Sequence, residues 1–265
     1  MKTRRLFYED VYIQEFEAIV LSCEEKYGKY HVILNATAFY PEGGGQPADK
    51  GMIDNIPVAD VQYIDGKLCH IMESPLEEGA QVVGKIDWNW RFDLMQQHSG
   101  EHIVSGMIHE KYGYENVGFH MGEEIITIDL SGMLTWQQVQ EIEKKVNYYI
   151  WMNQQVNIFY PDERQRKFIP YRSKKELTGE IRLVEFPGAD LCACCGLHVT
   201  HASQIGLVKI LSCKKFRDGV RMEMLSGKRA LDYLSGSTEQ NSQIAVSLSV
   251  KENETKEAVQ RLLDE

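Results

Sequence analysis

The first 88 residues alternate between apolar and polar side chains in short stretches. Apolar residues recur through residues 11–13, 18–21 and 31–34, and a Glu-Glu-Lys-Tyr-Gly-Lys turn separates the last two stretches. Strand-like runs continue at residues 58–63, 67–72 and 81–86, with turn signals between them at Asp65-Gly66 and Glu78-Gly79. Several short strands at this spacing predict a small β-barrel for residues 1–88.

The apolar spacing becomes helical after residue 89. Apolar residues lie three and four positions apart from Phe92 to His109 and again from Trp136 to Ile150, where Thr135 and Gln138 form a capping-box pattern. Strand-like runs lie between and after these helices at residues 125–130, 156–160, 181–185, 207–212 and 220–225. This pattern predicts an α/β core with a mainly antiparallel sheet over residues 89–235, and the α+β class for the chain.

Residues 236–265 form a third part. A polar tract opens it, and a helix-like segment with Val250, Val259 and Leu262-Leu263 ends it. The apolar side of this segment has no obvious partner within the chain. It predicts either the start of a helical extension or a helix that pairs with a second copy in a homodimer.

The composition is that of a globular protein, with 43% hydrophobic and 26% charged residues among 265. No apolar run approaches the roughly 18 residues of a membrane helix, and Glu9 and Asp10 interrupt the N-terminus before a signal core could form. We therefore expect a cytoplasmic protein without membrane contact. Four of the six cysteines lie between Cys192 and Cys213, which favours metal ligands or reactive thiols over a disulfide framework.

The net charge of −10 disfavours an indiscriminate nucleic-acid binder. Two basic stretches nevertheless flank the cysteine cluster: residues 164–175, with six cations and no acid, and the region from Lys209 to Arg229. Each stretch is either a solvated face or a surface for phosphates.

Two spaced pairs of side chains suggest a metal site. His98 and His102 lie four apart on a predicted helix, so both imidazoles project from one face. Cys194 and His198 repeat the spacing, and the combined set of three imidazoles and one thiolate suits one tetrahedral Zn²⁺ per chain. The alternative is a pair of surface histidines with cysteines buried in a core.

A different metal chemistry also fits the first pair. The sequence His98-x-x-Glu101-His102 matches the inverted zinc-protease motif, in which the glutamate acts as general base. Such a site would take a carboxylate as its third ligand, whereas this chain offers a cysteine and a histidine. The protease is therefore the weaker hypothesis.

A glycine motif lies in the N-terminal part. Gly43, Gly44 and Gly45 precede Gln46 and Asp49. Successive glycines permit positive φ and leave backbone N–H groups free to face an anion or a carbonyl. The motif is either a surface turn of the barrel or part of a binding site.

Together these motifs resemble the AlaX family, freestanding relatives of the editing domain of alanyl-tRNA synthetase. The resemblance covers roughly residues 5–235 and rests on five motifs in order. They are residues 39–49 around the three glycines, residues 91–102 ending in His-Ser-Gly-Glu-His, Val117-Gly-Phe-His-Met-Gly, Cys-Cys-Gly-Leu-His-Val with Gln204-Ile-Gly, and Arg217-Asp-Gly-Val-Arg-Met-Glu.

The resemblance implies a zinc-dependent aminoacyl-tRNA deacylase. Such an enzyme hydrolyses the ester that joins a wrong amino acid, usually serine and sometimes glycine, to tRNA(Ala). It assigns the zinc to His98, His102, Cys194 and His198, although Leu197 and Cys195 depart from the family's usual loop. His120 falls in the stretch that lines the family's amino-acid pocket, and Gln46 and Glu101 are further pocket or catalytic predictions. Phosphate contacts are expected from the following cations: Arg164, Arg166, Lys167, Lys174, Lys175, Lys214 and Lys215. A noncatalytic tRNA-binding module with structural zinc is the alternative function.

Overall fold

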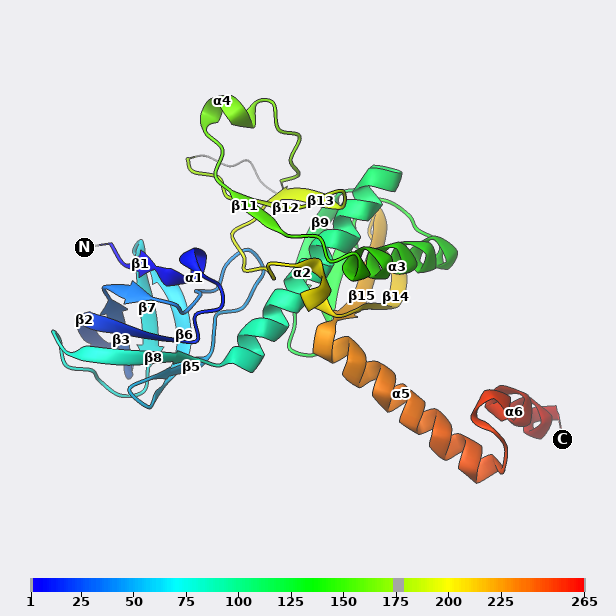
Figure 1. Ribbon diagram of the computed structural model, residues 1–265. Helices are drawn as coiled ribbons and strands as arrows, with labels where there is room; N and C mark the ends of the chain where they lie inside the picture. The colour runs from blue at the N-terminus through cyan, green and yellow to red at the C-terminus, as the bar shows by residue number, and fades with distance from the viewer. Residues whose placement is uncertain (1, 174–178, 265) are drawn as a thin grey trace.

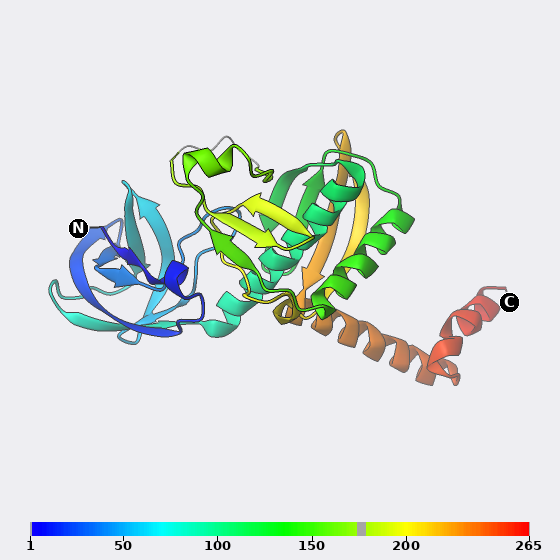
Figure 2. The ribbon, with the colours of Figure 1, turned by 45° about the horizontal axis from the view of Figure 1, so that its top comes forward.

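The computed structural model describes residues 2–173 and 179–264 and shows an elongated molecule. The N-terminal strands lie at one end, a body of helices and sheets lies in the middle, and the last helices project from the opposite end (Figures 1 and 2). A long helix, α2 (Trp88–Tyr112), leads from the strands into the body.

Six antiparallel N-terminal strands close into a barrel, in the order β2-β3-β7-β6-β5-β8. The ring closes where β8 pairs with β2, with Lys85 opposite Glu15. The period-two pattern explains the packing, because Phe16, Ala18 and Val20 are buried between exposed neighbours. The strands are β2 (Glu15–Lys26), β3 (Lys29–Leu34), β5 (Gly51–Ile53), β6 (Ile56–Ile64), β7 (Lys67–Met72) and β8 (Gln81–Ile86), with β1 (Arg4–Arg5), α1 (Leu6–Glu9) and β4 (Ala36–Thr37) beside them.

Two antiparallel sheets form the body, which confirms the prediction of a mixed architecture with antiparallel sheets. One has the order β14-β15-β10-β9 and the other β11-β12-β13. Helix α3 (Trp136–Trp151) packs on α2 and β14, and the predicted capping box of Thr135 and Gln138 is present. The remaining bounds are β9 (Asn116–Met121), β10 (Ile126–Leu130), β11 (Asn157–Phe159), α4 (Glu163–Arg166), β12 (Leu183–Phe186), β13 (Asp190–Ala193), β14 (Val208–Phe216) and β15 (Gly219–Ser226).

Helix α2 is the central element of the body. Asp87 caps its start by accepting from the backbone N–H of Trp90, and Gly113 ends it in a left-handed conformation with φ 70°. Every residue from Leu94 to Ile108 is buried, because sheets and helices surround this part of the helix. The polar residues of α2 must therefore find partners inside the protein.

A buried ion pair joins the barrel side to α2. The Arg91 guanidinium donates from Nε to Asp49 Oδ1 at 2.7 Å and from Nη1 to the Val11 carbonyl at 2.9 Å. The Asp49 carboxylate also accepts the Tyr40 N–H at 2.5 Å. These bonds fix the segment that contains the glycine motif against the start of α2.

The C-terminal helices begin earlier than predicted. Helix α5 (Gly227–Leu248) starts directly after β15 and runs through residue 236, so the expected start of the extension was wrong. The physical reason is that Gly227 and Ala230 are buried, which anchors the first turn of α5 to the body. Helix α6 (Thr255–Asp264) follows, and the homodimer stays a prediction. Among the described residues, no helix has the length and apolarity to cross a bilayer.

Candidate metal centre

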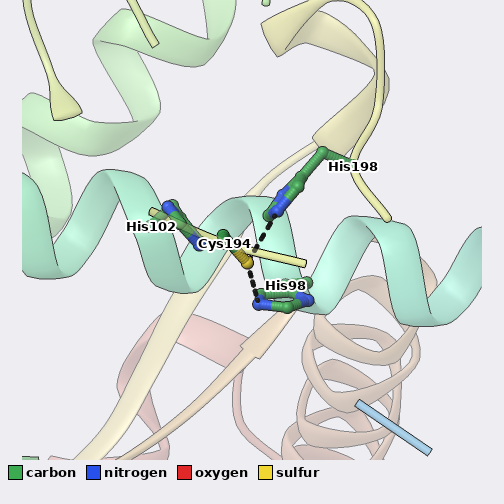
Figure 3. Close-up of side chains that lie close together, drawn as sticks. All are labelled: His98, His102, Cys194 and His198. Carbon is green, nitrogen blue, oxygen red and sulfur yellow. Dashed lines mark hydrogen bonds between the residues drawn. The ribbon is translucent and has the colours of Figure 1, made fainter. Parts of the chain in front are cut away.

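The four side chains that were predicted to bind zinc face one another (Figure 3). His98 and His102 project from the same side of α2, and Cys194 and His198 come from the segment that follows β13. One ligand atom from each residue lies within 4.8 Å of all the others. The Cys194 sulfur is 3.5 Å from Nε2 of His98 and 3.5 Å from Nε2 of His198.

These distances fit a tetrahedral zinc site. Zinc bonds of about 2.3 Å to sulfur and about 2.0–2.1 Å to nitrogen place the two donor atoms roughly 3.5 Å apart at a tetrahedral angle. Both measured sulfur–nitrogen separations are 3.5 Å. A set of three imidazoles and one thiolate is also the donor chemistry that zinc accepts.

The protonation states favour a cation at the centre. Burial by itself raises the pKa of the Cys194 thiol, but His98 and His102 hold that pKa well below its usual value, which favours the thiolate. Burial lowers the pKa of His198, and the two neighbouring histidines add to the effect. Burial opposes charge on His102 as well, yet Cys194 and Asp190 raise its pKa to about 10. A cation bound by the four residues would replace that proton.

Each of the three histidines predicted to bind zinc has a hydrogen-bond partner on its other ring nitrogen. The pairs, from Nδ1 to the partner oxygen, are His98–Gln46 at 3.0 Å, His102–Asp190 at 2.8 Å and His198–Ser99 at 3.3 Å. Such partners orient a ligating imidazole and set its tautomer. Here they turn all three Nε2 atoms toward Cys194.

Asp190 and Ser99 were missed by the sequence analysis. Asp190 is buried, and its second oxygen accepts from Arg172 Nε at 2.8 Å, so the carboxylate holds both groups in place. Its position two residues before Cys192 was a weak signal. Ser99 directly follows His98, but its bond to a histidine 99 residues away depends on the tertiary fold.

A cavity of about 390 Å³ lies beside the four residues, and we call it the metal cavity. His98, His102 and Cys194 form one part of its wall, and Gly44, Gly45 and Phe119 form another. The Phe119 ring stacks on His98 with centroids 5.3 Å apart and planes at 30°. Cys194 is partly exposed, so the centre is reachable from the cavity.

The glycine motif is both a tight turn and a wall of this cavity. Gly43 and Gln46 exchange backbone hydrogen bonds of 3.0 Å, and Gly44 and Gly45 have φ of 63° and 84°. A Cβ atom would lie 2.8 Å from the Cys195 sulfur at Gly44 and 2.8 Å from the Phe119 ring at Gly45. Both glycines are therefore needed for the backbone conformation and for the space beside the centre.

Comparisons with known proteins agree with this arrangement. Residues 5–90 match the family described as class II (A) tRNA synthetases, and residues 181–222 match the second additional domain of threonyl and alanyl tRNA synthetases. The alanyl-tRNA editing protein Aarsd1 of Mus musculus is 32% identical in an alignment of 275 positions that covers 97% of this chain and 67% of that protein. The chain belongs to the alanyl-tRNA editing protein family.

This chain covers a smaller share of two other relatives. The alanyl-tRNA editing protein AlaX-L of Pyrococcus horikoshii is 31% identical over 87% of this chain and 60% of its own length. The alanine–tRNA ligase of Ignicoccus hospitalis is 35% identical over 87% of this chain, but only 26% of the ligase is covered. The chain thus spans a quarter of this ligase and about two thirds of the editing proteins.

The structure places two of the predicted pocket residues, His120 and Glu101, outside the metal cavity, and their roles stay predictions. His120 is exposed and lines another cavity, with Trp90 and Glu123, because neighbours on strand β9 point to opposite faces and Phe119 takes the side of the metal cavity. Glu101 is buried with its carboxylate bonded to Ser105 Oγ at 2.6 Å and to the Asn116 amide. Helical phase turns it away from the His98 and His102 face.

Gln46 lies beside the predicted metal centre but outside the metal cavity. Its side chain is buried, and its Oε1 accepts the backbone N–H of Leu197 at 2.9 Å in addition to the His98 contact. It therefore contacts His98, a predicted zinc ligand, and does not line the metal cavity.

The expected phosphate-binding residues lie in separate places. Arg164 and Lys167 are exposed at α4, and Arg166 is half-buried and donates to the Gly179 carbonyl at 3.0 Å. Lys214 and Lys215 are exposed on β14. Lys174 and Lys175 lie outside the described residues. Four other cations of the second basic stretch form ion pairs with acids: Lys209, Arg221, Lys228 and Arg229.

Proposed function

We propose that this chain is a trans-acting, zinc-dependent hydrolase that deacylates tRNA(Ala) carrying serine, and also glycine. The observation that carries the proposal is the centre of three histidines and one cysteine in the wall of the metal cavity. The similarity to proteins named for alanyl-tRNA editing supplies the substrate class.

The residues around the cavity have distinct roles in this proposal. The four ligands would hold Zn²⁺, which when bound supplies positive charge beside the ester carbonyl. Gly44 and Gly45 line the cavity, and their N–H groups donate no hydrogen bond within residues 2–173 and 179–264. We assign these amides as donors to the oxygen that becomes negative during ester hydrolysis. Phe119 and His98 form a flat wall for the amino acid.

A noncatalytic tRNA-binding module is the second candidate function. Four protein ligands form the complete set that is typical of structural zinc, whereas catalytic zinc usually has three and a water. The protease hypothesis has less support. The glutamate that it requires as a base, Glu101, is bonded to Ser105 and Asn116 and does not line the metal cavity.

The test is deacylation of tRNA(Ala) charged in parallel with serine, glycine and alanine. We expect rapid release of serine, release of glycine, and little release of alanine. His98→Ala and Cys194→Ala should lose bound zinc and hydrolysis together. Cys213→Ala is the matched control, because Cys213 is a half-buried cysteine on β14 that belongs to no metal group among the described residues.

Two results would contradict the hydrolase. Zinc-loaded protein that leaves seryl-tRNA(Ala) intact but retains it on a filter would identify a binding module. Peptide cleavage that stops in Glu101→Gln would identify a protease.

A further inference from the structure

A separate cavity shares a wall with the metal cavity. Its volume is about 260 Å³, and Ala193, Cys194 and Cys195 line both cavities. Two arginines and two tyrosines, from the N-terminal segment and from positions next to strands β11 and β12, complete the lining. We call it the arginine–tyrosine cavity after these residues: Arg5, Tyr8, Tyr160 and Arg182. Since one short stretch of chain divides the two cavities, a ligand could enter both.

Tyr8 and Arg182 give this cavity a rigid base. The Tyr8 hydroxyl donates to the Cys195 carbonyl at 2.7 Å, and the ring lies 5.1 Å from the Arg182 guanidinium. Arg182 Nη1 donates to the carbonyls of Cys194 and Gly196, at 2.8 Å and 2.9 Å. The segment that provides a metal ligand is therefore also the segment that orders this cavity.

The rest of the cavity offers positive charge and an open aromatic ring. The Arg5 guanidinium lies 5.2 Å from the Tyr8 ring, and within residues 2–173 and 179–264 no carboxylate forms an ion pair with Arg5 or Arg182. Tyr160 is 47% exposed. Among the described residues that line the cavity, Glu180 is the only acid beside two arginines, so this lining is net positive in a chain of net charge −10. A ligand that combines an anion with a flat ring fits these features.

We propose that the arginine–tyrosine cavity binds a nucleotide of the single-stranded 3′ end of the tRNA, next to the terminal adenosine whose ester lies in the metal cavity. This inference rests on the proposed function. The base stacks on Tyr160 and the phosphate pairs with Arg5. Stacking on an aromatic side chain beside a cation is the usual way that proteins hold single-stranded nucleic acid.

Cleavage of two substrates tests the assignment. Tyr160→Ala should lower kcat/KM for seryl-tRNA(Ala) by about tenfold, the loss expected from one base–aromatic stack, mainly through KM. Arg5→Gln should act in the same direction. Cleavage of 3′-O-seryl-adenosine, which lacks the neighbouring nucleotide, should be unchanged in both variants. The controls are Tyr148→Ala, at a tyrosine 62% exposed on α3, and Arg261→Gln on α6.

Binding provides a readout that does not need hydrolysis. Wild type should bind a fluorescent, uncharged RNA hairpin ending in CCA more tightly than the same hairpin without CCA, and Tyr160→Ala should remove the difference. If wild type binds the CCA hairpin but cleaves no ester, the proposed function fails while the nucleotide site stands. Equal losses on seryl-adenosine and seryl-tRNA(Ala), or unchanged CCA binding in both variants, would overturn the site.

Discussion

The side-chain oxygen of Gln46, on the barrel side of the protein, lies 3.0 Å from Nδ1 of His98, on helix α2 of the body. Because Oε1 can only accept, Nδ1 carries the proton and Nε2 is left with its lone pair toward Cys194. A residue next to the three glycines thus sets the tautomer of His98, a predicted zinc ligand 52 positions later in the chain.

Replacing Gln46 should weaken the metal centre. We expect Gln46→Ala to lower zinc affinity by about 10–100-fold, the usual effect of losing a partner of a ligating histidine. Competition with a chromophoric chelator measures it. Gln81→Ala is the control, since Gln81 is exposed on β8 and bonded only to Glu17 among the described residues. Unchanged affinity in Gln46→Ala would show that this bond does not orient His98.

Asp190 orients His102 as Gln46 orients His98, but through a charged carboxylate. Asp190→Asn keeps the shape, yet it weakens the bonds to His102 and Arg172, so zinc affinity should fall by about 10–100-fold. Asp129→Asn is a matched control because Asp129 bonds Arg221 at 2.6 Å and belongs to no metal group among the described residues. Equal zinc affinity in the two variants would contradict a role for Asp190 at the centre.

Substitution of Gly45 should lower activity for two reasons. Gly45→Ala places a side chain at φ 84° and 2.8 Å from the Phe119 ring, so the backbone is strained and the ring, which lines the metal cavity, must shift. We expect seryl-tRNA(Ala) hydrolysis to fall by about tenfold or more, given the cost of misplacing a substrate. Gly28→Ala imposes the same kind of backbone strain, at φ 75°, with no atom within 4 Å. It should lose about 1 kcal/mol of stability and keep its activity.

His70 should make the stability of the barrel depend on pH. Burial lowers the pKa of His70 to about 4, and the ring is held between Thr37 and the Val32 carbonyl. The unfolded chain binds this proton at its ordinary pKa of about 6.5, so the contribution is complete above that pH and is lost as the pH falls toward 4. At pH 4.5 the loss should be about 2–3 kcal/mol.

Urea unfolding at pH 7 and pH 4.5 measures this effect. His70→Gln should reduce the difference between the two pH values, and His120→Gln, at an exposed histidine, should leave it unchanged. An equal pH dependence in wild type and His70→Gln would assign the acid sensitivity to other groups.

Some features of this protein could be derived from its sequence because they depend on neighbours along the chain. The spacing of His98 and His102 put both imidazoles on one side of a helix, and Thr135 with Gln138 marked the start of α3. In strand β2, the exposed Glu15 and Glu17 alternate with the buried Phe16 and Ala18. These are local consequences of helical and strand periods.

Strand β9 shows where periodicity was insufficient. Phe119 and His120 are adjacent and both bulky, so a period of two requires one to face the metal cavity but does not say which. The position of α2 and the glycine motif decides for Phe119. Similarly, the polar tract after residue 236 was predicted to open a third part of the chain, yet helix α5 continues through it because the first turn of α5 is anchored at Ala230.

The sequence by itself determined the types and local spacing of the four predicted zinc ligands, because the two members of each pair lie within five consecutive residues. Only the tertiary structure decided that Cys194 lies 3.5 Å from His98 across 96 residues of chain, and that Gln46, Ser99 and Asp190 bond the outer nitrogens. Contacts at such separations depend on how α2, the glycine turn and the segment after β13 pack together. That packing is a property of the whole core and of no single stretch of sequence.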